Sequence, residues 1–339
     1  MEHACKGQWT FNGSNRLKHS NRCWMLRGWE LEVSASGADL TVISVVKQPP
    51  QFFKPSALPI DDEICGGFQI VSVGEAAFLF CNNISSVAVP RGVTSIGEGA
   101  FHNCRELADV TIPESVIEID CWAFCGCDKL TNVVIPSSVA KIGAQAFALC
   151  GNLQRISVSE NNRDYCSVDG VVFSKDKTRI VAFPAGRSGA YEIPGGVTSV
   201  DDGAFCGCVN LTSVIVPDSV VSIGESAFED CNSLANVRIG CRVSSIGERA
   251  FDTCSSLSAV ELPDSVVSIG NWAFEDCSSL ASVRIGRGVT SIEPRAFSCC
   301  GSNATIFVSP ENPVYHAIDG KQLRCKKNGA QLFPCPEEK

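Results

Sequence analysis

The sequence has little of what enzymes, membrane-spanning proteins and nucleic-acid-binding proteins need. Its 339 residues include only four histidines, which leaves few side chains for acid–base catalysis near neutral pH. Lys and Arg total 28 against 37 Asp and Glu, and the formal charge of −9 disfavours a nucleic-acid partner. No apolar run approaches the roughly 20 residues of a membrane helix. These shortages favour a non-enzymatic protein without a visible membrane segment.

The start of the chain is also poor in apolar residues. The stretch MEHACKGQWTFNGSNRLKHS has no apolar core of the kind that a secretory signal contains. Two interpretations stay open: the protein remains inside the cell, or its natural N-terminus lies upstream of Met1.

An internal repeat is the strongest feature that the sequence does have. The dipeptide Ala-Phe recurs, and within each of two runs the phenylalanines are 23 residues apart. A cysteine follows three residues after each of them. The phenylalanines are Phe78, Phe101, Phe124 and Phe147, then Phe205, Phe228, Phe251, Phe274 and Phe297. Because 23 residues suit one solenoid coil, and a single coil cannot bury its apolar side alone, the coils are predicted to stack.

Each repeat predicts two short strands. In one unit, Leu130, Val133 and Ile135 alternate with other residues before Pro136, which is tolerated at a strand end. A second extended piece with the pattern V-x-x-I-G turns at Gly143. A tight turn or short helix that carries Ala-Phe-x-x-Cys then leads to the next leucine.

The composite pattern L-x-x-V-x-I-P-x-x-V-x-x-I-G-x-x-A-F-x-x-C resembles the BspA-like leucine-rich repeats of bacterial surface proteins and some protozoan ones. The resemblance covers Ile70 to about Val308. It implies a leucine-rich repeat solenoid of the α/β class, built mostly from short parallel β-strands joined by turns or short helices. It also implies a surface adhesin or attachment factor that binds host matrix or surface proteins, located at the cell surface or outside the cell.

The parts without the repeat are predicted to be caps and insertions. Residues 1–60 are expected to form an N-terminal β cap, and residues 61–339 the solenoid. The second run of repeats is preceded by a predicted β-hairpin insert at about 159–190. A similar sequence at about 309–339 predicts a second hairpin insert or a C-terminal cap. An exposed solenoid end needs such covering, because it presents unpaired strand edges.

Twenty cysteines require an explanation. Equivalent residues of stacked coils lie at least about 4.8 Å apart and point the same way, whereas a disulfide needs converging Cβ atoms about 3.8 Å apart. The repeat cysteines are therefore predicted to be buried, reduced and structural. This cysteine ladder consists of Cys81, Cys104, Cys127, Cys150, Cys208, Cys231, Cys254, Cys277 and Cys300.

The other eleven cysteines follow no shared pattern. The Cys-Gly-Cys sequences at 125–127 and 206–208 lack a second ligand pair at zinc-finger spacing, so no metal or other cofactor is predicted. A cysteine-dependent metal or redox function is the weakest alternative. So many thiols are hazardous in an oxidising compartment, which conflicts with a surface location and favours an intracellular interaction scaffold as the alternative function.

Candidate binding residues come from the outward position of each main strand. These positions form one line down the predicted sheet: Ala88, Thr111, Val134, Ser157, Glu192, Ile215, Arg238, Glu261, Arg284 and Phe307. The predicted protein-binding site is the second half, Glu192, Ile215, Arg238, Glu261, Arg284 and Phe307. Arg and aromatic residues are enriched in interfaces. In the alternative interpretation the charges only pair with one another, and Lys175–Lys177 is the second choice of site.

Overall fold

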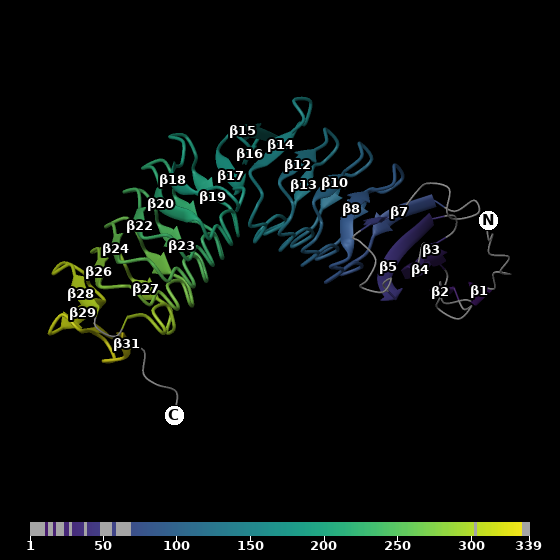
Figure 1. Cartoon of the computed structure of the whole chain (residues 1–339). Helices are drawn as coiled ribbons and strands as arrows, with labels where there is room; N and C mark the ends of the chain where they lie inside the picture. Colours follow the sequence, from purple (N-terminus) through teal and green to yellow (C-terminus); the bar gives the residue numbers. More distant parts are fainter. Residues whose placement is uncertain are drawn as a thin grey trace.

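The structure is a computed structural model, and it shows an arch of stacked coils (Figure 1). Side chains are described over residues 70–301 and 304–333. The backbone is described there, at Gln69 and at 11–12, 16–17, 24–26, 29–36, 39–47 and 56–58. The predicted leucine-rich repeat solenoid of short parallel strands is confirmed by this architecture.

The main row is the set of strands that begins each coil. It is formed by β8 (Ile84–Ala88), β10 (Asp109–Thr111), β12 (Asn132–Ile135), β14 (Arg155–Val158), β18 (Gly189–Glu192), β20 (Leu211–Ile215), β22 (Asn236–Arg238), β24 (Ala259–Leu262), β26 (Ser282–Ile285) and β28 (Thr305–Val308). Its strands pair in parallel in three groups, β8 with β10, β12 with β14, and β18 through β28, with partners 22 or 23 residues apart, as Asn132 pairs with Arg155.

The second row is the set of short strands that follows the turn after a main-row strand, except that β7 precedes β8 and β17 follows the first insertion. They pair in parallel in two groups, one ending at β13 and one starting at β17. The second row is β7 (Gln69–Val73), β9 (Ser95–Ile96), β11 (Glu118–Ile119), β13 (Lys141–Ile142), β17 (Arg179–Ala182), β19 (Ser199–Val200), β21 (Ser222–Ile223), β23 (Ser245–Ile246), β25 (Ser268–Ile269) and β27 (Ser291–Ile292).

Six strands precede the first coil. The long strands β4 and β5 form an antiparallel pair, and β5 pairs in parallel with β7 of the second row. The six are β1 (Phe11–Asn12), β2 (Arg16–Leu17), β3 (Trp24–Leu26), β4 (Trp29–Ser36), β5 (Asp39–Lys47) and β6 (Ser56–Leu58). Much of the predicted cap, 1–60, lies outside the described residues, and its boundary stays a prediction.

The return segments between coils are turns, and the described residues contain no helix. Of the two predicted options for this segment, turns or short helices, the described part of the chain uses turns. The reason is local: Trp122 and Gly126 flank Phe124 in the left-handed region, with φ of 54° and 71°. Two left-handed residues within five positions cannot belong to a right-handed helix.

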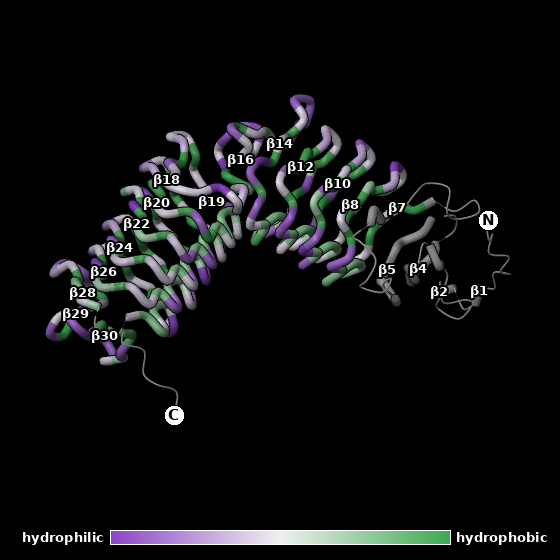
Figure 2. The backbone as a smooth tube through the Cα atoms, viewed as in Figure 1, coloured by the Kyte–Doolittle hydropathy of each residue, from purple (hydrophilic) through white to green (hydrophobic). Residues whose placement is uncertain are grey.

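The core is a stack of phenylalanine rings. Phe101 and Phe124 are fully buried, and their ring centroids are 5.3 Å apart with an interplanar angle of 5°. Phe228 and Phe251 repeat this arrangement at 5.0 Å. Along each coil hydrophobic and hydrophilic residues alternate, as Figure 2 shows, so each strand sends one set of side chains inward. These burials confirm the predicted core.

Most of the described core lies in two large clusters, one in the first run of coils and one in the second. The ring stack runs from Phe78 to Phe147 and starts again at Phe183, whose centroid lies 4.8 Å from that of Phe205. Ala182-Phe183 is therefore a further member of the repeat. This coil was not predicted from the sequence because Phe183 lies outside the 23-residue spacing. The Ala-Phe dipeptide could have identified it.

Two insertions have the same architecture. The first contains β15 (Tyr165–Val168) and β16 (Val171–Ser174) before β17, and the second contains β29 (Tyr315–Ile318), β30 (Gln322–Cys325) and β31 (Gln331–Phe333). They lie within the ranges 159–190 and 309–339 that were predicted for hairpins.

In the first insertion, the buried Asn162 donates to the carbonyls of Pro136 and Val139, and the Tyr165 hydroxyl accepts the N–H of Ile142. Asn312 and Tyr315 make the matching contacts in the second insertion. Both insertions thus satisfy backbone groups where a run of coils ends.

Candidate functional site

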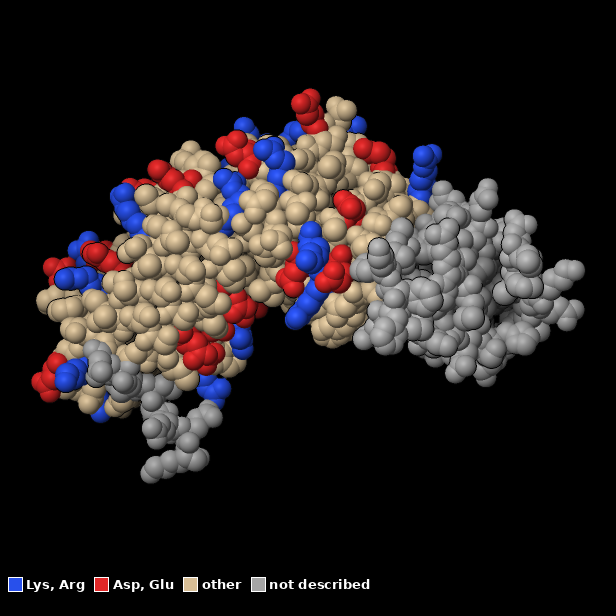
Figure 3. All heavy atoms as spheres, in the orientation of Figure 1, with Lys and Arg blue, Asp and Glu red and all other residues tan. Residues whose placement is uncertain are grey.

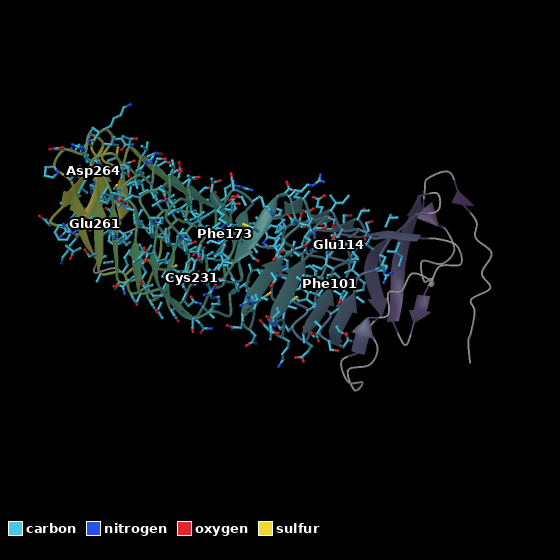
Figure 4. All side chains as sticks on the ribbon, turned by 90° about the horizontal axis from the view of Figure 1, so that it is seen from above. Phe101, Glu114, Phe173, Cys231, Glu261 and Asp264 are labelled. Carbon is cyan, nitrogen blue, oxygen red and sulfur yellow. The ribbon has the colours of Figure 1, made fainter. Side chains whose placement is uncertain are left out.

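The predicted binding residues lie on adjacent strands of the main row. Register pairs Glu192 with Ile215 and Ile215 with Arg238, and it pairs Glu261 with Arg284 and Arg284 with Phe307. Strands β22 and β24 pair only through Asn236 and Ala259, so the strand register does not pair Arg238 with Glu261. All six are exposed except Ile215, which is half-buried. Glu261 lies in the C-terminal half of the arch, far from Phe101 (Figure 4).

Arg284 and Phe307 form a preassembled pair in this surface. The guanidinium carbon of Arg284 lies 4.8 Å from the ring centroid of Phe307, a cation–π contact. Phe307 is 46% exposed, so its outer face remains available. Among the described residues no ion pair joins Glu261 to Arg238 or Arg284. The described ion pairs therefore give no support to the alternative in which these charges only neutralise one another.

Most other charged side chains belong to ordinary solvated surface. On the face seen in Figure 3 they lie mainly along the two rims of the arch, with a broad uncharged area between. Several are paired across coils, as Lys141 is with Glu118 and Arg287 with Asp264 at 3.2 Å. Exposed pairs of this kind contribute at most about 1 kcal/mol. They do not mark a site.

The second-choice site at the first insertion is only partly available. Lys175 donates through Nζ to the carbonyl oxygens of Glu160 and Asn162, at 3.1 and 2.6 Å. Lys177 is exposed. Since the Lys175 ammonium group already serves as a structural donor, the tip offers one unengaged cation rather than two.

A pocket that the sequence did not reveal lies where the first run of coils meets the second. Its volume is about 380 Å³, and it is lined by β13 and the following turn on one side and by β17, β19 and β21 on the other. Arg179, Asp201 and Asp202 provide its charges, and Ser199 and Ser222 its hydroxyls. The interruption between the two runs was visible in the sequence, but a cavity there depends on packing that no local pattern encodes.

The pocket charges are partly paired. Arg179 Nη1 donates to Asp201 Oδ2 at 2.8 Å, and Asp202 Oδ1 accepts the N–H of Glu225 at 2.8 Å. Burial raises the pKa of the Asp201 carboxyl to about 6, and the Arg179 guanidinium only partly offsets this. The Asp201 side chain is 21% exposed. The negative charge that Asp201 carries at neutral pH therefore destabilises the folded state.

Replacing Asp201 with Asn should stabilise the protein near pH 7.5 but not near pH 4. A folded-state pKa above the unfolded value of about 3.9 stabilises the fold below pH ~4, and this contribution is lost as the pH rises through ~6. The Asn side chain does not ionise, so the variant does not lose this stability as the pH rises. Its free energy of unfolding should therefore exceed that of the wild type by up to about 3 kcal/mol at pH 7.5. Thermal unfolding of both proteins at the two pH values measures the difference.

The matched control for that prediction is Asp218→Asn. Asp218 Oδ1 accepts the backbone N–H of Cys241 at 2.8 Å, and this bond lowers the pKa of the Asp218 carboxyl, whereas burial raises that of Asp201. The control should not gain stability at pH 7.5. A pH-independent difference between Asp201→Asn and the wild type would contradict the assignment of the burial cost to Asp201.

The cysteines of the ladder lie in the core. They are buried except Cys300, and seven of them donate S–H to the phenylalanine carbonyl of the preceding coil, as Cys254 does to Phe228 at 3.2 Å. Cys125 and Cys206 are buried beside Ala148, in a small separate cluster. The sixteen cysteines in the described part are not joined by disulfides, and no group of three or more potential ligands able to hold a metal occurs there. No described helix is long and apolar enough to cross a membrane.

Comparison with known proteins identifies the repeat. A search of the curated proteins found no match. A leucine rich cell surface protein of Faecalibacterium prausnitzii is 25% identical, with 90% of this chain and 96% of that chain covered and a TM-score of 0.64. The pneumococcal vaccine antigen PcpA shares the fold at 20% identity, with 84% and 92% covered and a TM-score of 0.65.

The family model of the BspA type leucine rich repeat region matches residues 71–186 and 189–313, in six copies. The match covers well over half of the sequence and includes both runs of coils. The chain therefore belongs to the BspA-type leucine-rich repeat family, whose repeats occur in bacterial surface proteins and typically serve as non-enzymatic scaffolds for protein interaction.

Proposed function

We propose that this chain is a surface adhesin or attachment factor that holds a protein partner on the C-terminal half of its main row. The observation that carries the proposal is the side-by-side placement of Glu261, Arg284 and Phe307 on β24, β26 and β28, with their side chains exposed. The similarity to a leucine rich cell surface protein supports the surface role.

The residue types suit a contact with a protein. Interface anchors are enriched in Arg and aromatic residues, because both bury much area and form directional contacts. Arg284 is held over Phe307 at 4.8 Å, which limits the side-chain freedom that binding would remove. The N-terminal half of the row offers Ala88, Thr111 and Ser157, which are small and uncharged. Contact energy should therefore concentrate in the second half.

Changing both Arg238 and Arg284 to Ala should weaken partner binding strongly. Loss of interface anchors costs about 2 kcal/mol or more, so the dissociation constant should rise at least about thirtyfold. The measurement is the affinity of purified wild-type and variant chains for a partner captured by the wild type from host matrix proteins.

The control is the double change of Thr111 and Ser157 to Ala in the other half of the row. It should leave the affinity unchanged, and both double variants should unfold near the wild-type temperature, because exposed side chains contribute under about 1 kcal/mol. An unaltered dissociation constant in the arginine variant would remove the main row as the site.

An intracellular interaction scaffold is the second candidate, and the free thiols favour it. The sixteen described cysteines include the exposed Cys241, which is open to oxidation outside the cell. The two candidates differ in accessibility on intact cells. An antibody against the folded chain should label intact cells of the source organism if the protein is an adhesin, and only permeabilised cells if it is a scaffold.

A further inference from the structure

The second row is interrupted between β13 and β17. In regular coils the N–H after each second-row strand donates to the preceding coil, as Gly143 does to Ile119 at 2.8 Å and Gly224 to Val200 at 2.9 Å. After β13 this pattern stops, because β17 pairs with β16 and β19 instead. β13 is thus the last strand of its sheet, and we call its unpaired side the open edge; no strand pairs there, although the Tyr165 hydroxyl accepts the N–H of Ile142 on it.

Some backbone groups along the open edge have no backbone partner. Within the described ranges, no backbone N–H donates to the carbonyl oxygen of Ile142, and the N–H groups of Gln145 and Phe147 have no backbone acceptor. Ile142 is only half-buried, whereas its equivalents on the neighbouring coils, such as Ile119, are buried. The carbonyl oxygen of Ile142 is therefore an acceptor still available at this edge, next to the N–H that Tyr165 engages.

The pocket of about 380 Å³ lies along this edge. Ile142, Gly143 and Ala144 form one wall, and Arg179, Asp201 and Asp202 contribute to the other. This volume falls within the range of ligand-binding pockets. Two carboxylates against one guanidinium give the pocket a net charge of −1, so a cation is the complementary occupant.

We propose that this pocket binds an extended segment of a partner protein, with its main chain along the open edge of β13 and a Lys or Arg side chain between Asp201 and Asp202. Strand addition to an exposed edge supplies affinity through main-chain hydrogen bonds, and the side-chain pocket supplies selectivity. The inference rests on the proposed protein-binding function and adds a second contact that prefers basic segments.

Electrostatics inside the pocket favour the same occupant. Asp201 is charged at neutral pH against a burial cost that Arg179 offsets only in part. A bound ammonium or guanidinium group would lower that cost, because it brings a second positive charge to a poorly solvated carboxylate. Asp202 keeps one oxygen engaged by the N–H of Glu225, which fixes its carboxylate at the rim of the pocket.

A direct titration tests the proposal. The probe is the fluorescein-labelled peptide acetyl-Val-Lys-Val-Lys-Val-amide, compared with the same peptide carrying Gln in place of Lys. The Lys peptide should bind at least about tenfold more tightly, and the double variant Asp201→Asn, Asp202→Asn should abolish that preference. N-methylation of the peptide backbone, which removes its donors to β13, should weaken binding about fivefold or more.

Asp218→Asn is the matched control, because Asp218 accepts a backbone N–H as Asp202 does but does not line the pocket. Equal binding of the Lys and Gln peptides, no detectable binding of either, or an equal loss in Asp218→Asn overturns the proposal. The titration uses only the purified chain and peptides, so a failure here leaves the main-row proposal standing. That proposal fails separately, through unchanged partner affinity in the Arg238 and Arg284 variant.

Discussion

Replacing Phe251 with Ala should lower the free energy of unfolding of the second run of coils by about 3–5 kcal/mol. The Phe251 ring is fully buried between those of Phe228 and Phe274, with centroids 5.0 and 5.2 Å away. Its removal leaves a cavity that the neighbours cannot fill, because backbone bonds hold the coils at a fixed spacing. Phe228 donates to Ala250 and Phe251 to Ala273, each at 2.8 Å. The cost therefore includes both lost burial and an unrelaxed cavity.

Urea denaturation followed by circular dichroism measures this effect. Because the core divides into two clusters, the transition that involves residues 171–333 should move to lower urea while the other moves less. Phe307→Ala is the matched control, since that ring is 46% exposed and its loss should cost under about 1 kcal/mol. Equal shifts for the two variants would show that the ring stack does not carry the stability assigned to it.

The stacked core could be predicted from the sequence because its determinants are periodic. Each Ala-Phe-x-x-Cys occupies the same place in every coil, so Phe101, Phe228 and their equivalents had to share one environment. The strands followed from the alternation around Val133 and its equivalents. Whether the return was a turn or a helix could not be decided, because left-handed backbone at a residue such as Trp122 has no sequence signal.

The junction could be predicted only in part. The irregular interval before Phe205 indicated an insertion, but Phe183 was missed because it lies outside the 23-residue spacing and Gly186 stands where the repeat has a cysteine. The pocket beside β13 depends on which strand pairs with β17, and register between distant segments is set by tertiary packing. For the main row, the sequence placed Arg284 and Phe307 next to each other. It could not show that Arg284 stacks on the ring, because rotamers depend on the surroundings.

The thiols of the cysteine ladder should react with iodoacetamide at least about a thousandfold more slowly than the exposed thiol of Cys241 in the native protein. Cys231, Cys254 and Cys277 are fully buried, and each donates its S–H to a phenylalanine carbonyl, at 3.2, 3.2 and 3.3 Å. Burial raises the pKa of the Cys254 thiol well above its ordinary value, so the reactive thiolate is scarce. Alkylation then requires local unfolding of a coil, which the neighbouring coils oppose.

Mass spectrometry of timed alkylation reactions, with and without denaturing urea, measures the ratio. Cys241 lies on an exposed turn and is the internal reference within the same molecule. In urea the ladder thiols should react as fast as Cys241, because unfolding removes both burial and the S–H bond. The shared orientation of the ladder positions keeps neighbouring sulfurs on parallel vectors, which does not suit a disulfide. A disulfide between adjacent ladder members, or native reactivity equal to that of Cys241, would contradict the structural role of the ladder.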